Sequence, residues 1–268
     1  MIRQAVSLVF CAVLSAIPTV TNATPTVLLG SDYLETTAGT AFMGAPFVGV
    51  PIGPGSTDTI VHRMANADFP SGVGSSTAPI PIELVALNLV SAVPIDLGAG
   101  TNFYYITLQS ARGGPASLGT MTIKLNAADD GLPGTPEGTF DSFFDVFFDI
   151  RVGSLAGPIV SSNDLILANS GAQWDANPAP GTVVVTGGVG AQAANLHNGK
   201  TADQLDFFPL FISEQEAGVA VHNVVPAAVP EPAILLLAAF GLAGLGMSRR
   251  NRAYAKSAAS TSRRRTAE

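Results

Sequence analysis

Acidic and amide side chains in the middle of the chain could bind a metal ion. Asn126, Asp129 and Asp130 lie in a segment rich in turn residues, with Asp141 or Asp145 as a further ligand. Calcium prefers several carboxylate and carbonyl oxygens on flexible loops, although this spacing does not match an EF-hand loop. The pattern predicts either a calcium site or an ordinary solvated turn, and we expect no other cofactor.

Three aspartates, Asp141, Asp145 and Asp149, recur at four-residue intervals in the segment 140–150. Paired carboxylates can serve as general acid and base in a hydrolase, but nothing in this spacing requires that role. As a strand, the segment places four apolar side chains and Ser142 on the face of Phe140, and places the aspartates with Phe143 and Phe147 on the other. Its aromatic content and flanking glycines favour a strand over a helix.

Other chemistry is sparse, so we expect no enzymatic activity. His62, His197 and His222 stand apart in the sequence, and no Gly-x-Ser-x-Gly or His-Glu-x-x-His motif occurs. A sugar-binding site is an alternative, because aromatic rings can stack on sugars. Its candidates are Trp174 with Asp175 and Asn177, or the pair Tyr104 and Tyr105.

The composition favours an all-β fold. Only 12% of the 268 residues are charged, and the chain holds 28 glycines and 19 prolines. Strands are expected at 58–63, 80–93, 140–150, 182–186, 205–212 and 219–225, and at 103–109 paired antiparallel with 119–126. We therefore predict that residues 24–225 form an antiparallel β-sandwich.

Charge is distributed unevenly along the chain. Residues 24–232 hold five basic and 19 acidic side chains, a net charge of −14. Such an acidic body argues against binding to nucleic acid. The single cysteine, Cys11, lies within the first 23 residues, so a protein without them has no thiol chemistry.

The first 23 residues have the pattern of a secretory signal peptide. Arg3 supplies the positive start, residues 5–14 are apolar, and small residues precede a cleavage site after Ala23. An uncleaved N-terminal anchor is the alternative, and both predict export of the body.

The C-terminal part of the chain, residues 226–252, combines three features in order. A proline-locked motif, Val229-Pro230-Glu231-Pro232, is followed by an apolar run at 233–247 and by Arg249, Arg250 and Arg252. The prolines keep the motif extended. The apolar run predicts a transmembrane helix, and the arginines a cytoplasmic stop to transfer, with residues 253–268 as a basic cytoplasmic tail.

This arrangement closely resembles the PEP-CTERM sorting signal of exported proteins in Gram-negative bacteria. The resemblance implies recognition by exosortase at residues 229–232, cleavage there, and release to the cell surface or extracellular matrix. It implies as partners exosortase, the secretory machinery, the membrane transiently, and exopolysaccharide. The chain departs from the usual signal by continuing to Glu268, and a tail anchor that is never cut is the alternative.

The sequence therefore predicts an exported, non-enzymatic protein of the cell surface or matrix. The first alternative is a carbohydrate- or calcium-binding matrix adhesion module. The second is a secreted hydrolase with paired carboxylates.

Overall fold

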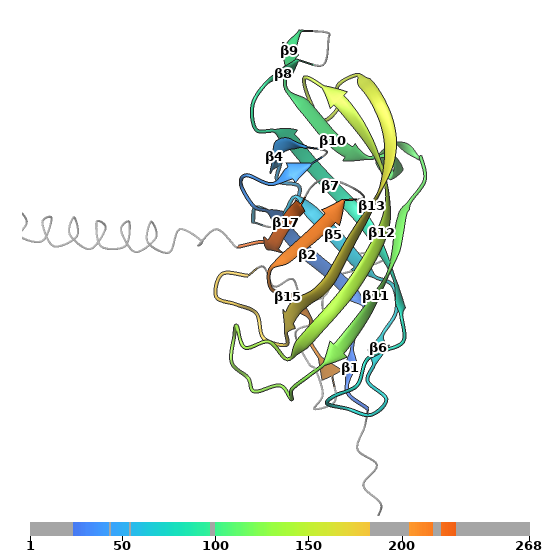
Figure 1. The fold of residues 1–268 in the computed structure, drawn as a ribbon, viewed down its shortest axis with the longest axis vertical. Helices are drawn as coiled ribbons and strands as arrows, with labels where there is room; N and C mark the ends of the chain where they lie inside the picture. Colours follow the sequence, from blue (N-terminus) through green and yellow to red (C-terminus); the bar gives the residue numbers. More distant parts are fainter. Residues whose placement is uncertain are drawn as a thin grey trace, which may run out of the picture.

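The protein is built from β-strands. The computed structural model describes residues 24–42, 44–53, 55–96, 100–182, 204–216 and 221–228 (Figure 1). Across these ranges the only helical element is one 3-10 turn, η1 (Gln109–Arg112). The all-β prediction is confirmed.

Eight strands form the wall of the fold, and shorter strands extend or flank them. The wall strands are β2 (Gly30–Thr36), β5 (Thr59–Arg63), β7 (Ile80–Ser91), β11 (Ser117–Leu125), β12 (Gly138–Val152), β13 (Ile159–Asp175), β16 (Ile212–Glu216) and β17 (Val221–Pro226). The shorter strands are β1 (Thr26–Val27), β3 (Ala41–Phe42), β4 (Ala45–Gly49), β6 (Ala67–Asp68), β8 (Ile95–Asp96), β9 (Thr101–Asn102), β10 (Tyr104–Leu108), β14 (Gln204–Leu205) and β15 (Phe208–Pro209).

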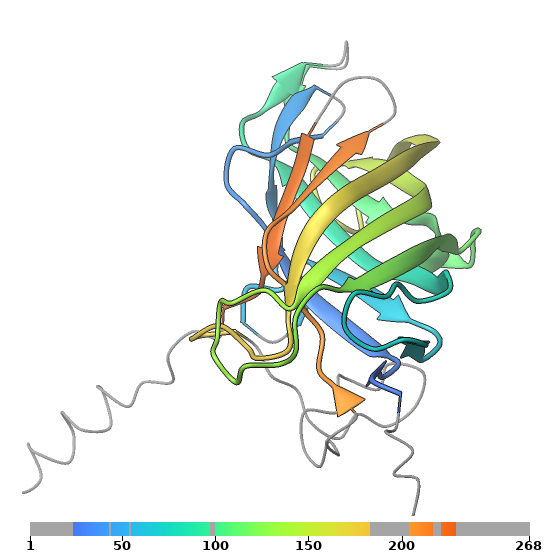
Figure 2. The ribbon, with the colours of Figure 1, turned by 60° about the horizontal axis from the view of Figure 1, so that its bottom comes forward.

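The wall closes on itself. Each wall strand pairs antiparallel with the next one along the chain, and β17 pairs back onto β2, with Val224 opposite Thr36 and Pro226 opposite Leu34. The predicted β-sandwich is therefore wrong, and the fold is a closed barrel of eight strands, whose curvature Figure 2 shows. Both architectures bury one face of each strand, so the same alternation of residues fits either.

The predicted pairing of 103–109 with 119–126 is also wrong. β10 and β11 follow one another along the same course, and each pairs with both β7 and β12. The turn η1 and Gly113, which has a left-handed backbone (φ 83°), form an excursion between them rather than a reversal. The glycines at 113 and 114 thus mark a break between two strands, β10 and β11, that occupy the same place in the wall between β7 and β12.

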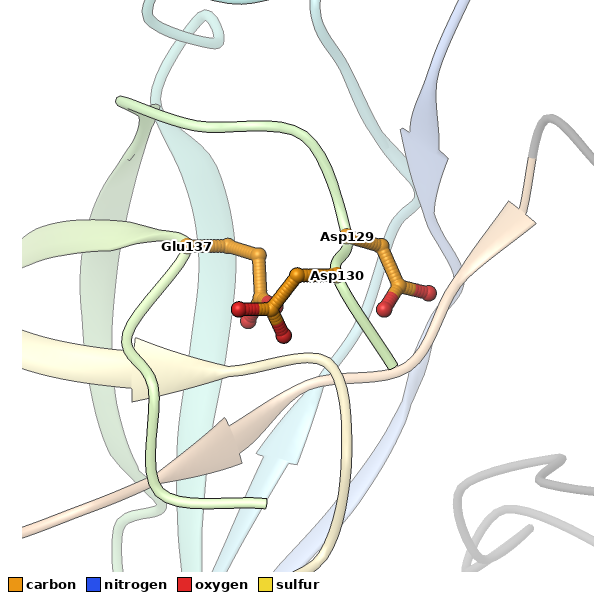
Figure 3. A group of neighbouring side chains, drawn as sticks. All are labelled: Asp129, Asp130 and Glu137. Carbon is orange, nitrogen blue, oxygen red and sulfur yellow. The ribbon is translucent and has the colours of Figure 1, made fainter. Parts of the chain in front are cut away.

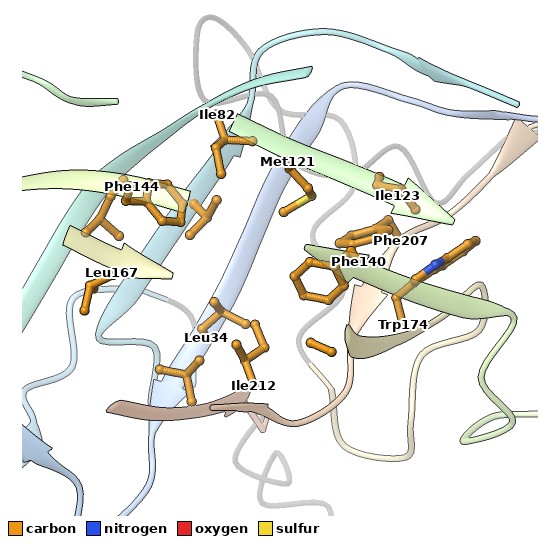
Figure 4. Close-up of a cluster of buried hydrophobic side chains, with 14 of the residues drawn as sticks. Leu34, Ile82, Met121, Ile123, Phe140, Phe144, Leu167, Trp174, Phe207 and Ile212 are labelled. Carbon is orange, nitrogen blue, oxygen red and sulfur yellow. The ribbon is translucent and has the colours of Figure 1, made fainter. Parts of the chain in front are cut away.

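Aromatic and aliphatic side chains fill the barrel interior (Figure 4). Phe140, Phe144, Val146 and Phe148 of β12 are buried, whereas Phe143 is 42% exposed, which confirms the predicted strand and its inward face. Trp174 is stacked between other aromatic residues, with its ring centroid 6.3 Å from that of Phe69 and 5.3 Å from that of Phe207.

One end of the interior also encloses a charged pair. The guanidinium of Arg63 contacts the carboxylate of Asp32, and both residues are buried. The same guanidinium lies 4.8 Å from the ring centroid of Phe207. Charge pairing and the ring face together compensate for the loss of water around this cation.

The structure contains no membrane-spanning helix among the residues it describes. The apolar run 233–247 and the leader 1–23, which carry the predictions of a transmembrane helix and a signal peptide, lie outside the described residues.

We expect substitutions at Phe144 and Phe143 to change the free energy of unfolding by different amounts, because Phe144 points into the barrel and Phe143 points out. Phe144→Ala removes a ring from the packed interior and should lower the free energy of unfolding by about 3–5 kcal/mol. Phe143→Ala, one residue away on the outer face, should cost at most about 1 kcal/mol. Denaturant unfolding of both variants measures this, and similar losses would contradict the inward register of β12.

Candidate metal centre

The loop between β11 and β12 is closed at its base by backbone hydrogen bonds. The N–H groups of Asn126 and Ala127 both donate to the carbonyl of Glu137, at 2.7 and 2.9 Å. Within the loop, Asp129 accepts from the N–H of Gly131 and Asp130 from the N–H of Leu132, each at 2.8 Å. These local bonds fold the acidic side chains back over the loop.

Three carboxylates meet here. One oxygen from each of Asp129, Asp130 and Glu137 lies within 4.8 Å of the other two. Figure 3 shows the side chains of Asp130 and Glu137 pointing toward one another, with Asp129 beside them. Glu137 is only 1% exposed, whereas the two aspartates are exposed to solvent.

Glu137 is poorly compensated as an anion. Its Oε2 accepts a hydrogen bond from the N–H of Ala176, while Oε1 is buried and has no hydrogen-bond partner in the described part of the protein. Burial raises the pKa of Glu137 to about 7; the Ala176 N–H opposes this, and the charges of Asp175 and Asp129 add to it.

Residues at the end of β13 hold the loop in place through hydrogen bonds. Asp175 is fully buried and accepts hydrogen bonds from the N–H groups of Gly134 and Asn177. The side-chain amide of Asn177 donates to Asp129 at 2.8 Å. Residues 41 and 48 positions apart in the sequence therefore hold the loop and its acidic side chains in place. Asp175 adds a fourth carboxylate beside the three.

The structure brings together two of the predicted calcium ligands, Asp129 and Asp130, and adds Glu137. Asn126 lies at the base of the loop, where it contributes a backbone N–H. Asp141 binds elsewhere: it accepts from the N–H of Gly171 at 2.7 Å and the hydroxyl of Ser170 at 3.0 Å. Sequence reasoning missed Glu137 and named Asp175 only as part of a sugar site. The one available signal was that Glu137 ends the same turn-rich segment.

The aspartates of β12 do not converge as a hydrolase pair would. Asp141 and Asp145 are four residues apart on one strand, a separation of about 13 Å. Asp149 is buried and accepts from Arg112 at 2.6 Å, from Arg151 at 3.3 Å and from the Ser162 hydroxyl at 2.7 Å. The hydrogen bonds from Arg112, above all, hold the pKa of Asp149 below its usual range.

His222 is not isolated in the fold. Its ring nitrogens lie 3.3 Å from Glu214 Oε2 and 3.4 Å from the Thr36 hydroxyl, which donates to Asp58 at 2.8 Å. A hydroxyl beside a histidine that in turn contacts a carboxylate is the arrangement by which enzymes activate a nucleophile. Here all four residues are buried, and the adjoining cavity of about 10 Å³ has room for one water at most. Burial raises the pKa of Asp58 despite these hydrogen bonds.

The proposed sugar-stacking residues are not accessible as a group. Trp174 and Asp175 are fully buried and Tyr104 is 2% exposed, so these three cannot offer a ring face or a carboxylate to a sugar. Tyr105 and Asn177, the other members of the two predicted groups, are partly exposed. A separate apolar pocket of about 210 Å³ lies near β4 and β10, and of its lining residues only Tyr104 carries a polar side chain.

The C-terminal residues are recognisable by comparison with known families. Residues 228–250 match the model of the PEP-CTERM protein-sorting motif. The chain carries a PEP-CTERM sorting signal. The signal marks an exported protein made as a membrane-anchored precursor, with exosortase as its processing partner. Neither a curated protein nor a solved structure matches the chain.

The PEP-CTERM signal begins where the barrel ends. β17 ends at Pro226, Ala227 is buried and donates its N–H to the carbonyl of Tyr33, and Ala228 pairs with Thr182. Val229, Pro230, Glu231 and Pro232 follow directly, and they lie outside the described residues, as do Arg249, Arg250 and Arg252. The barrel is thus complete before the motif starts.

We expect Asp149 to stabilise the fold rather than to act in catalysis. Asp149→Asn removes the anion held by Arg112 and Arg151 and should lower the free energy of unfolding at pH 7 by about 1–3 kcal/mol. Because the pKa of Asp149 is lowered in the fold, its contribution is present above its unfolded pKa of about 3.9 and is lost as pH falls below that value. The difference from wild type should therefore shrink in acid.

Denaturant unfolding from pH 7 down to pH 3 measures this difference. Asp145→Asn, on the outer face of the same strand, serves as the matched control and should leave stability almost unchanged. A difference for Asp149→Asn that stayed constant with pH would contradict the ion-pair role.

Proposed function

We propose that this protein is a non-enzymatic component of the cell surface or extracellular matrix, delivered by export and released when exosortase cuts at residues 229–232. In this proposal the barrel is the mature, functional body. The apolar run holds the precursor in the membrane until cleavage, and Arg249, Arg250 and Arg252 hold its far end in the cytoplasm.

The observation that carries the proposal is the position of the PEP-CTERM signal relative to the barrel. Among the described residues, the last strand closes the wall at Pro226 and the last buried residue is Ala227. Cleavage at the motif would therefore leave in place every wall strand and core side chain that the structure describes. The folded barrel could therefore be released intact, which suits a protein that acts outside the cell.

The lack of catalytic activity is part of the proposal. Among the described residues, the relay-like group around His222 is enclosed, and Asp149 is held in ion pairs. A hydrolase with paired carboxylates remains the alternative. Its pair would have to come from Asp141 or Asp145 and a residue on a neighbouring strand.

A calcium-binding matrix module is the second candidate, and the acidic group at Glu137 favours it. Contact with exopolysaccharide is the further proposal that the location suggests. On the described surface, Trp174 and Tyr104 are not available for it because both are buried.

We expect Glu231→Ala to block C-terminal processing in the native host. Glu231 is the charged residue between the two prolines of the motif. Its substitution changes the recognition sequence and leaves every residue of the barrel unaltered. Intact mass of the protein from envelope and medium measures the result. Wild type should lack the leader and the residues beyond about position 232, whereas the variant should retain its C-terminus and stay in the membrane.

Glu268→Ala provides the matched control, since it makes the same change outside the motif and should be processed like wild type. Recovery of wild-type chains that all end at Glu268, in membranes only, would overturn the proposal and leave an anchored surface protein. Normal processing of Glu231→Ala would show that the motif is not what the protease reads.

A further inference from the structure

We propose that the carboxylates of Asp129, Asp130 and Glu137, with Asp175 behind them, form a calcium-binding site at one end of the barrel. The site would take a single divalent cation, held by the β11–β12 loop beside the end of β13. The inference is independent of what happens to the C-terminal signal.

The buried oxygen of Glu137 is the observation that points to a ligand. Glu137 is 1% exposed, and its Oε1 has no hydrogen-bond partner in the part of the chain that the structure describes. A buried carboxylate oxygen without a partner is costly, and a metal ion is one of the few groups that compensates it. This oxygen belongs to the side chain that lies with Asp129 and Asp130 in one group (Figure 3).

Basic side chains offer little alternative compensation. Of the five in residues 24–232, Arg63 is engaged with Asp32, and both Arg112 and Arg151 are engaged with Asp149. Lys124 is exposed to solvent near the end of β11, and Lys200 lies outside the described residues. Asp175 uses its oxygens for the N–H groups of Gly134 and Asn177, and so contributes charge rather than a ligand atom. The excess negative charge at this end of the barrel is what a cation would neutralise.

The donor set selects calcium over other common metals. All three side chains offer hard oxygen atoms, and the group contains no histidine or cysteine, which zinc and copper prefer. Two of the three ligands stand on an irregular loop. Such a loop suits the variable geometry and the six to eight oxygens of calcium better than the strict octahedron of magnesium. Backbone carbonyls and water would complete the shell.

A bound ion would hold the two arms of the β11–β12 loop together, because Asp129 and Asp130 stand near the start of this loop and Glu137 at its end. Asn177 and Asp175 already connect the end of β13 to the loop at Asp129 and Gly134. Adding a cation between Asp129, Asp130 and Glu137 would remove the repulsion among them. Calcium outside the cell would then stabilise this end of the barrel.

Terbium luminescence tests for the site directly, because Tb³⁺ replaces Ca²⁺ on oxygen ligands and emits when a nearby indole is excited. Trp174 is the only tryptophan and precedes Asp175. We expect the full chain, purified in detergent and treated with EGTA, to show Tb³⁺ emission that saturates at one ion per chain and is displaced by Ca²⁺. Absence of indole-sensitised emission would overturn the proposal.

Thermal unfolding of variants tests the ligands. Wild type should gain about 5–10 °C in Tm at Ca²⁺ concentrations 100-fold above Kd, and less with Mg²⁺. Glu137→Gln should lose most of this gain and, in EGTA, should melt above wild type, because one buried negative charge is gone. Asp164→Asn makes the same charge change on the exposed face of β13 and should behave like wild type.

Asp130→Asn gives a second ligand variant on the exposed side of the group, should Glu137→Gln fail to fold. It should weaken the Ca²⁺ response and Tb³⁺ binding together. An unchanged Ca²⁺ gain in either ligand variant would overturn the site, and an equal gain with Mg²⁺ would overturn its assignment to calcium.

Discussion

The pairing of the last strand with the first is the constraint on which the rest of the fold depends. Without the β2–β17 ladder the wall would be an open sheet with two unpaired edges, and edges of that kind invite aggregation. β17 also supplies His222 and Val224 to the interior. Because almost 190 residues separate the partners, the barrel closes only after nearly the whole body has been exported. The PEP-CTERM signal comes immediately afterward, so its apolar run follows a strand that the barrel needs for closure.

Closure also determines where function can lie. The interior is occupied by aromatic side chains and by buried polar groups, including the Arg63–Asp32 pair and the network around His222. The cavity beside His222 is about the size of one water molecule. Apart from the apolar pocket near β4 and β10, the described interior is largely filled by side chains, so the loops at the ends of the barrel offer more room for a ligand. The acidic group at Glu137 is one such loop site.

The sequence predicted those features that depend on local alternation. In β12 the inward positions alternate with outward ones and all but Ser142 are apolar, so strand and face were both predictable. β13 was not recognised, because its first half is polar, with Ser161, Ser162, Asn163 and Asp164, and the strand exists through its long pairing with β12. Closure itself was not predictable, since a sandwich and a barrel require the same alternation.

The candidate site shows the same division between local and long-range information. Asp129 and Asp130 were predictable from turn chemistry, but the burial of Glu137, next to the tightly packed Gly138, was not. A Cβ at Gly138 would lie 1.8 Å from the carbonyl oxygen of Lys124 and 2.6 Å from the indole nitrogen of Trp174, so only glycine fits there. Gly138 sits between Leu125 and Trp174 in the ladder, and the preceding residue, Glu137, accepts a hydrogen bond from the N–H of Ala176 just beyond the end of β13. The position of Glu137 beside the two aspartates therefore depends on contacts between segments far apart in the sequence, and composition alone could not have revealed it.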